Sequence, residues 1–471
     1  MDKIKICYIG GGSRNWAWVL MQDLAFEKEI GGTIELYDLK HDDAVTNEII
    51  GGRLMAKHNE GRWKFHANAS LADALSGSDF VIISILPGDF EEMAVDVHTP
   101  EKYGIYQSVG DTTGPGGIIR ALRAIPQFIQ IAREIKKYSP DAWVINYTNP
   151  MSVCTRALYK EFPDIKAFGC CHEVFHTQKL LASVLEDAGL AQAGSIKREE
   201  ILVNVIGINH FTWIDKASWN DIDIFPYYKK YAEKYADTGA NIKNVNSNPD
   251  EDEKERKKYF GSRDRVKMDL FRRYGLIAAA GDRHLAEFCP PSWYLSSPET
   301  AESWDFASTP VSWRIKDREK LKQKAIAYKS GSIEMIPVES GEEGIKIIKA
   351  LLGIKDLVTN VNLPNKGQLF DLRYGAVVET NACFSQNNVI PVSTKKIPVD
   401  VLALLNHHVL IQEGIIEAVF KKDMEKAFRF FSHDFAVQKL RLCDARDLFE
   451  KMCALTGVQG NRIDAEHQPG I

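Results

Sequence analysis

The feature that most constrains the fold is a glycine-rich turn near the start of the chain. Residues 3–9 form a continuous apolar run, Gly10 to Gly12 follow at once, and helical spacing begins near Trp16. Glycines at such a turn let the backbone bend sharply and approach a ligand, and the following helix presents free N–H groups at the positive end of its dipole. A strand, a turn and a helix in this order indicate the first unit of a parallel α/β sheet.

The first half of the chain repeats this alternation of apolar runs and helical patterns. Further strand-like runs occupy residues 33–39, 80–86, 143–147, 165–170 and 201–208. Buried parallel strands are continuously apolar, as these runs are. We therefore predict an α/β fold: a doubly wound, Rossmann-like parallel sheet with a second, mixed α/β lobe.

Composition excludes several classes of protein. The 59 Lys and Arg residues against 64 Asp and Glu residues give a net charge of −5, without the basic excess of a nucleic-acid-binding protein. No apolar run approaches the roughly 18 residues that span a bilayer, and strand-like sequence from residue 3 leaves no room for a signal peptide. The eight scattered cysteines are typical of reduced cytosolic thiols. We expect a cytoplasmic protein that binds neither nucleic acid nor membrane.

The glycine turn carries most of a dinucleotide-binding fingerprint. Gly10 and Gly12 keep its spacing, and Asn15 replaces the third glycine. Ser13 can donate to a phosphate or cap the helix, and Asp38, at the end of the second strand, can accept from a ribose diol and repel a 2′-phosphate. We predict that Gly10, Gly12, Ser13 and Asp38 bind NAD; the alternative is a structural turn in an α/β protein with another ligand.

The length of the chain suggests two fused units. Its 471 residues are roughly three times the 150 residues of a typical domain. We place the NAD-binding domain at residues 1–200. Residues 201–471 would form an α/β domain for substrate, metal and oligomerisation. The Asn-rich segment 241–248 and the charged run 250–258 read as a solvated loop and an exposed helix start.

A thiol and an imidazole follow two successive strand-like runs. Cys171 comes directly after residues 165–170, and His210 comes shortly after residues 201–208. The carboxyl ends of strands in a doubly wound sheet line the ligand crevice, so these side chains could meet there. Together they suit a divalent metal with open positions for substrate oxygens. A buried cysteine without a metal is the alternative.

The ordered motifs resemble glycoside hydrolase family 4, the NAD- and metal-dependent glycosidases. The matching segments are 8–13 (YIGGGS), 146–150 (NYTNP), 169–173 (GCCHE), 207–210 (GINH) and 267–275 (KMDLFRRYG). The resemblance implies a domain related to lactate and malate dehydrogenases, a second α/β lobe, and a homodimer or homotetramer. The Cys-His-Glu-Val run at 171–174 is similar to the subgroup that cleaves α-galacturonides, so we expect a small oligosaccharide or uronide substrate.

The resemblance also implies an unusual route of hydrolysis. NAD oxidises the sugar C3 hydroxyl, a base removes the acidified C2 proton, and a divalent metal, usually manganese, stabilises the enediolate. The glycosidic oxygen leaves with help from an acid, water adds, and the hydride returns. We keep three alternatives: a family 4 α-galactosidase, α-glucosidase or α-glucuronidase; an NAD-dependent 2-hydroxy acid dehydrogenase; and a non-catalytic NAD-binding protein.

The resemblance assigns roles to particular residues. It implies that Cys171 and His210 hold the metal, that Asn149 contacts the sugar hydroxyls, and that Asp269 is the C2 base. His172 stands where phosphosugar-cleaving members carry an acidic or amide residue, and it can serve as the general acid near neutral pH.

Other interpretations of the charged residues stay open. Asp269 could instead pair with Arg272 or Arg273 on a helix surface. A uronate carboxylate calls for a guanidinium partner, for which Arg283 is our candidate. The role of Glu173 is open, because a carboxylate beside an anionic sugar repels it unless it has a hydrogen-bonding partner.

Overall fold

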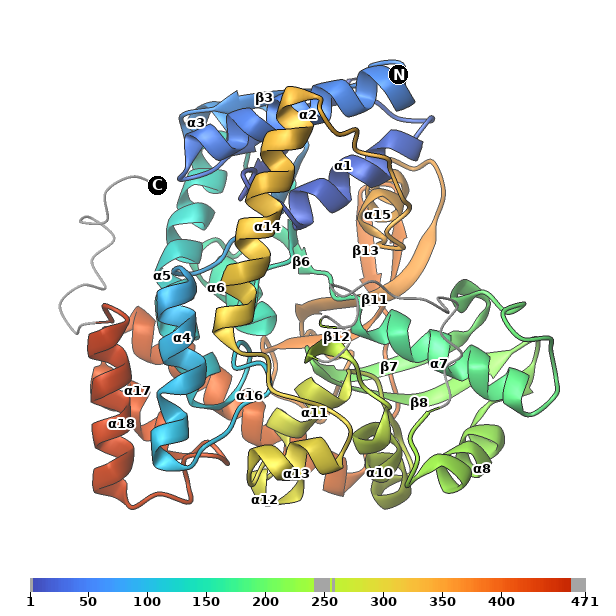
Figure 1. The fold of residues 1–471 in the computed structure, drawn as a ribbon, viewed down its shortest axis with the longest axis vertical. Coiled ribbons are helices and arrows are strands. Elements are labelled where there is room, and N and C mark those ends of the chain that lie inside the picture. Colours follow the sequence, from blue (N-terminus) through green and yellow to red (C-terminus); the bar gives the residue numbers. More distant parts are fainter. Residues whose placement is uncertain (1–2, 241–254, 256–258, 459–471) are drawn as a thin grey trace.

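The computed structural model describes residues 3–240, 255 and 259–458. Within this part of the chain, the central feature is a nine-stranded sheet with the order β13-β12-β11-β6-β5-β4-β1-β2-β3 (Figure 1). Its parallel strands are β1 (Ile4–Ile9), β2 (Gly32–Tyr37), β3 (Trp63–Asn68), β4 (Phe80–Ile83), β5 (Trp143–Asn146) and β6 (Lys166–Gly169). The order 3-2-1-4-5-6 is that of a Rossmann fold, so the predicted doubly wound sheet is confirmed.

Helices cover both faces of this sheet. Because side chains alternate between faces, Cys7 and Ile9 pack under one helical layer while Ile6 and Tyr8 pack under the other. The first layer is α5 (Gly114–Tyr138), α6 (Met151–Glu161) and α16 (Val399–Phe420), with α3 (Leu71–Leu75). The second is α1 (Trp16–Phe26), α2 (His41–His58) and α15 (Gly344–Leu351).

Three antiparallel strands from the second half of the chain extend the sheet beyond β6. They are β11 (Leu357–Pro364), β12 (Val377–Ser385) and β13 (Asn388–Pro391). The large sheet therefore takes strands from both sides of residue 200, and the division into residues 1–200 and 201–471 stays a prediction.

A second, smaller sheet forms the core of the predicted mixed lobe. It consists of β7 (Leu202–Ile208), β8 (Phe211–Trp219) and β10 (Ile277–Ala278), with β9 (Ile222–Asp223) paired to β8. We expected residues 201–208 in the parallel sheet, and this was wrong. Only Asn209 and His210 separate β7 from β8, which suits a tight hairpin and is too short for a parallel crossover.

The remaining helices surround these two sheets (Figure 1). They are α4 (Phe90–His98), η1 (Pro100–Tyr103), α7 (Glu173–Asp187), η2 (Arg198–Glu200), α8 (Phe225–Tyr235), α10 (Arg265–Tyr274), α11 (Asp282–Phe288), α12 (Pro291–Tyr294), α13 (Pro298–Ser303), α14 (Val311–Ser330), α17 (Met424–Ser432) and α18 (Leu442–Leu455). Of the described helices, α16 alone is long and apolar enough to cross a bilayer by length and composition. Its apolar side chains pack in the core beneath the large sheet and beside α17.

Candidate active site

The glycine turn lies between β1 and α1, beside the neighbouring strand β4, where the strand order of the large sheet reverses. Gly10 has φ +94°, and a Cβ on it would lie 2.0 Å from the carbonyl oxygen of Ser84. A Cβ on Gly12 would lie 2.7 Å from the Cβ of Asp43. Neither position has room for a side chain, so the backbone is left bare at the point where Rossmann folds bind dinucleotides.

The other two residues predicted to bind a nucleotide border this turn. Asp38 accepts hydrogen bonds from the backbone N–H of Gly12 to Oδ2 and of Lys40 to Oδ1, both at 2.9 Å. Burial raises the pKa of Asp38, and these two bonds oppose the rise. Ser13 Oγ accepts from the backbone N–H of Trp16, the first residue of α1, at 3.2 Å, which leaves its hydroxyl hydrogen available to a ligand. The structure therefore brings all four residues to one turn.

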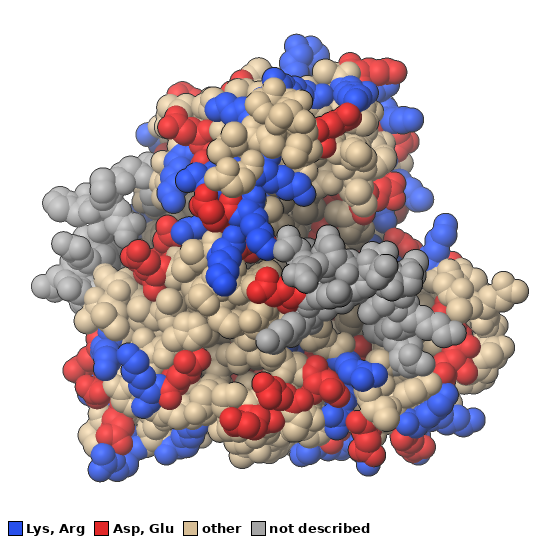
Figure 2. All heavy atoms as spheres, in the orientation of Figure 1, with Lys and Arg blue, Asp and Glu red and all other residues tan. Residues whose placement is uncertain are grey.

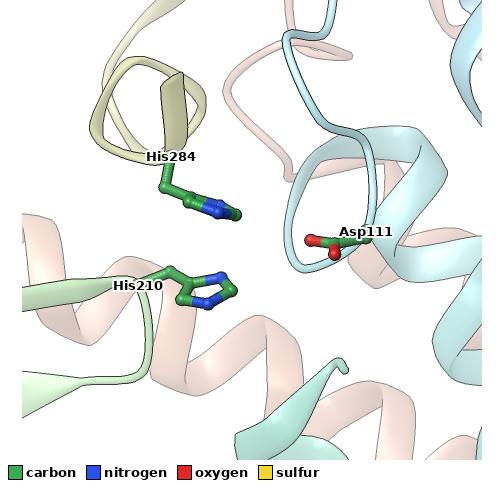
Figure 3. Close-up of side chains that lie close together, drawn as sticks. All are labelled: Asp111, His210 and His284. Carbon is green, nitrogen blue, oxygen red and sulfur yellow. The ribbon is translucent and has the colours of Figure 1, made fainter. Parts of the chain in front are cut away.

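A second group of polar side chains consists of Asp111, His210 and His284. One ligand atom from each lies within 4.8 Å of the others, and Figure 3 shows the side chains converging from a loop, a hairpin turn and a short helix. Asp111 precedes α5, His210 lies in the β7–β8 turn, and His284 belongs to α11. His210 has φ +65°, a left-handed conformation that is uncommon outside glycine and typical of tight hairpin turns.

Thr112 fixes the protonation of His210. Its Oγ1 lies 2.7 Å from Asp111 Oδ1 and 2.9 Å from His210 Nδ1. A hydroxyl carries one hydrogen, which goes to the carboxylate, so Oγ1 accepts from His210 Nδ1–H and the Nε2 lone pair stays free. Burial and the neighbouring His284 lower the pKa of His210 to about 3. The ring is therefore uncharged at neutral pH, and its Nε2 lone pair can be donated to a metal ion. Neutral imidazoles oriented in this way are the usual nitrogen ligands of metals.

Glu173 lies beside the second imidazole, that of His284. Its Oε2 accepts from the Gly281 N–H at 2.6 Å, and its Oε1 lies 3.6 Å from His284 Nε2. Burial opposes ionisation, yet His284, His210 and His172 hold the pKa of Glu173 down to about 2. His284 Nδ1 is buried without a described partner. Glu173, whose role the sequence left open, thus places a carboxylate beside one nitrogen of His284, while the other nitrogen keeps its capacity to bind a ligand.

Cys171 lies beside this group but not within it. The side chain of Asn209 lies next to both Cys171 and Glu379, and Asn360 donates to the Cys171 carbonyl at 3.0 Å. Burial raises the pKa of the Cys171 thiol well above its usual range, and the charges of Glu379 and Glu173 add to the rise. The structure therefore links Cys171 to the His210 hairpin through Asn209, the residue before His210, while His210 forms the three-residue group with Asp111 and His284.

Buried side chains hold these segments in place. Glu379, on β12, accepts from Asn360 at 2.7 Å and from Thr212 at 3.0 Å, and so ties the His210 hairpin to the large sheet. His408 Nε2 lies 2.7 Å from the Phe288 carbonyl and must donate to it, while Nδ1 lies 3.2 Å from Thr113 Oγ1. His408 thereby joins the loop that carries Asp111 to the helix that carries His284.

Two of the residues assigned by resemblance border the group. Asn149 donates from Nδ2 to Asp111 Oδ2 at 3.2 Å, and its Oδ1 is buried without a described partner, free to accept from a sugar hydroxyl. His172 is half-exposed, with Nδ1 3.3 Å from Glu342 Oε1. Its ring centroid lies 5.8 Å from that of Trp16. His172 therefore stands between the glycine turn and the Asp111 group.

The structure does not bring Asp269 to this group. Its Oδ2 lies 2.8 Å from Arg273 Nε and accepts from the Tyr294 hydroxyl at 2.6 Å. This is the ion-pair alternative considered for the helix surface. Lys267, also on α10, donates from Nζ to Thr177 Oγ1 at 2.9 Å. Thr177 belongs to α7, the helix that begins at Glu173. A base role for Asp269 thus rests on the resemblance alone.

Arg283 lies next to His284, as its place in the sequence requires. It is buried and donates from Nη2 to the Ser108 carbonyl at 2.5 Å and to Thr309 Oγ1. Its Nε is buried without a described partner. The guanidinium is close to the group, but part of its donor capacity is already used by the protein.

Comparison with known proteins finds relatives along most of the chain. The model described as Family 4 glycosyl hydrolase matches residues 5–187, and the Family 4 glycosyl hydrolase C-terminal domain matches residues 205–437. An alpha-galacturonidase from Thermoanaerobacter italicus is 54% identical over 452 residues, 96% of each chain.

Solved structures share the fold. The crystal structure of lplD from Bacillus subtilis has a TM-score of 0.90 at 49% identity and covers 96% of this chain and 100% of that one. A 6-phospho-alpha-glucosidase from gut microorganisms, in complex with NAD and Mn²⁺, has a TM-score of 0.79 at 19% identity and covers 97% of this chain and 98% of that one.

Proposed function

The chain belongs to the family 4 glycosyl hydrolases, and from this premise we propose that it hydrolyses α-galacturonides with NAD and a divalent metal ion, preferably Mn²⁺. The observation that carries the substrate class is the 54% identity, over 96% of both chains, to an alpha-galacturonidase. The residues around the glycine turn and around Asp111 supply the donors that such a reaction needs.

The glycine turn fits NAD. Gly10 and Gly12 keep the turn free of side chains, which would collide with Ser84 and Asp43, and α1 begins four residues after Gly12, so a pyrophosphate could approach bare backbone near a helix N-terminus. Asp38 keeps a carboxylate where a ribose diol binds and where a 2′-phosphate would be repelled. NAD bound there would supply a hydride acceptor for the sugar C3 carbon.

The Asp111 group fits a divalent metal. The bond to Thr112 leaves a lone pair free on His210, and Nδ1 of His284 is buried without a described partner. Cys171, next to the side chain of Asn209, would join His210 as a ligand once its thiol loses a proton. The metal would supply Lewis-acid polarisation of the sugar C2 and C3 oxygens.

The protein's own side chains would orient the sugar and move protons. Asn149 Oδ1 can accept from a sugar hydroxyl next to Asp111. His172 is exposed enough to exchange protons with solvent, and its contact with Glu342 provides a carboxylate partner for the protonated ring. We keep His172 as the general acid. Asp269 remains a candidate C2 base from the resemblance, and the contacts above favour a structural role.

The test uses di-galacturonic acid in deuterated buffer with NAD, Mn²⁺ and a reductant. Hydrolysis with deuterium fixed at C2 of the released monosaccharide, and without accumulated NADH, is the expected result. A His284→Gln variant should lose this activity, whereas His433→Gln, a matched change away from the group, should keep it. Cleavage of neutral α-galactosides or α-glucosides in place of the uronide would move the chain to another activity of the family, and net NADH formation would indicate a dehydrogenase.

We expect the protein to form a homodimer or homotetramer and to be located in the cytoplasm. All eight cysteines are free, as suits a reducing compartment. Sedimentation velocity of the purified chain tests the oligomeric state.

A further inference from the structure

Two arginines flank one aromatic ring beside the Asp111 group. The guanidinium carbon of Arg283, on α11, lies 5.0 Å from the ring centroid of Phe260, and that of Arg314, on α14, lies 5.6 Å from it. Both distances are within the range of cation–π attraction. The ring therefore holds two cations close together although they come from different helices.

The two guanidinium groups differ in how the protein uses them. Arg283 is buried and donates to Ser108 and Thr309, which belong to the segments on either side of it. Arg314 is only partly buried, and within the described residues it has no hydrogen bond or ion pair. A guanidinium offers five N–H donors in a planar fork that matches a carboxylate. Arg314 thus has its full donor capacity available to a ligand.

Arg314 is also close enough to Asp111 and Arg120 to interact electrostatically with both. Burial lowers its pKa, and the opposite charge that most counters this effect is Asp111, while Arg120 acts in the same direction as burial. Arg120 is itself directed at the site, because its Nε donates to the Asn149 carbonyl at 3.2 Å. Arg314 therefore lies at the edge of the group to which Asn149 and Asp111 belong.

Three guanidinium groups gather around this point. Arg120, Arg283 and Arg314 approach it, and the carboxylates of Asp111, Glu173 and Glu287 face them; burial raises the pKa of Glu287 to about 7, so its negative charge is only partial at neutral pH. On the face drawn in Figure 2, basic side chains gather over α14, in which seven of 20 residues are Lys or Arg: Arg314, Lys316, Arg318, Lys320, Lys322, Lys324 and Lys329. An anionic sugar would be attracted along this helix and would meet Arg314 at the site.

We propose that Arg314 binds the carboxylate of the uronate substrate through its free guanidinium fork, with Arg283 fixed behind Phe260 as a second positive charge. The inference rests on the proposed function and deepens it, because it names the residue that distinguishes a uronide from a neutral glycoside. Arg283, the residue predicted from the sequence to bind the carboxylate, would add positive charge at the site without hydrogen-bonding the carboxylate directly.

The experiment compares Arg314→Gln with the wild type on three substrates that share a leaving group: an α-galacturonide, its methyl ester and the α-galactoside. Loss of a charge-assisted bidentate contact should lower kcat/KM for the acid by roughly 10- to 100-fold, and leave kcat/KM for the ester and the galactoside within about threefold. Arg314→Lys, which keeps the charge but loses the fork, should fall between the two for the acid.

Lys322→Gln is the matched control, since it removes one positive charge from an exposed position of the same helix. It should reduce kcat/KM for the acid by no more than about twofold, and only at low ionic strength. Melting temperature and NAD affinity, measured for each variant, separate a folding defect from a loss of recognition. If Arg314→Gln does not fold, the same comparison on Arg314→Lys decides.

The possible outcomes distinguish failure of the Arg314 inference from failure of the proposed function. An unchanged preference for the acid in a folded Arg314 variant overturns the inference while the proposed function stands. An equal loss on all three substrates also overturns it, because a general effect on catalysis is not recognition of a carboxylate. A wild-type enzyme that does not cleave the galacturonide overturns the proposed function itself.

Discussion

Binding of Mn²⁺ should release one proton at neutral pH, and Cys171 should be its source. The three members of the Asp111 group are already deprotonated there: the pKa of His210 lies at about 3, burial lowers the pKa of His284, and His284 and Arg120 hold the pKa of Asp111 low against the effect of burial. Burial keeps the Cys171 thiol protonated. A metal that takes Cys171 as a ligand must displace that proton.

The magnitude follows from linkage. Between pH 6 and pH 8 the free protein carries one more proton at Cys171 than the metal complex, so the association constant should rise about tenfold per pH unit. Over the two units this is about 100-fold, or about 2.7 kcal/mol at about 1.36 kcal/mol per unit. The affinity for Mn²⁺ should increase with pH, because the Cys171 proton is bound only in the metal-free protein.

Calorimetric titration of the NAD-loaded protein with Mn²⁺, in buffers of different ionisation enthalpy, measures the released protons directly. The wild type should release about one proton and Cys171→Ala close to none. Cys170→Ala is the control, since it removes a neighbouring buried thiol that no argument places at the metal. A pH-independent affinity in the wild type, equal to that of Cys171→Ala, would refute the thiolate ligand and leave the metal to Asp111, His210 and His284 alone.

Three further changes test the remaining assignments. Glu173→Gln should weaken Mn²⁺ binding by roughly 10- to 100-fold without changing NAD affinity, because it removes the carboxylate that orients His284; equal metal affinity in a titration would contradict this role. Asp269→Asn should lower the free energy of unfolding by about 1 kcal/mol through its contacts with Arg273 and Tyr294 and should retain C2 exchange; loss of exchange by NMR would instead make Asp269 the base. Gly12→Ala should weaken NAD binding at least about tenfold in a fluorescence titration, since its Cβ would lie 2.7 Å from that of Asp43; unchanged affinity would place the nucleotide elsewhere.

The parallel part of the fold could be predicted because buried strands can be recognised in the sequence as continuous apolar runs. β3 was missed for the opposite reason: in Trp63–Asn68 exposed Lys64 and His66 alternate with buried Trp63 and Phe65, as expected at the edge of a sheet. β7 was assigned to the wrong sheet, because an apolar run does not reveal its partner. The two-residue spacing before β8 was the available signal, and it indicates a hairpin.

The nucleotide turn could be predicted because it is local, whereas the Asp111 group is not. Thr112 and His210 are 98 positions apart, and Glu173 and Gly281 are 108 apart. Asp111 follows no strand, and His284 lies in a short helix of seven residues, so neither carries the strand-end signal that drew attention to Cys171.

Thr112 and Glu173 explain how two imidazoles can lie with ring centroids 3.8 Å apart in a buried site. Two charged rings at that distance would repel strongly. His210 instead gives its Nδ1–H to Thr112, His284 has the Glu173 carboxylate 3.6 Å from its Nε2, and burial lowers the pKa of both rings so that they stay neutral. The loop, the hairpin and the helix are thus held in the arrangement that a cation would stabilise. It follows that metal should protect these three segments from hydrogen exchange together, and Glu173→Gln should lose that joint protection before the sheet itself is affected.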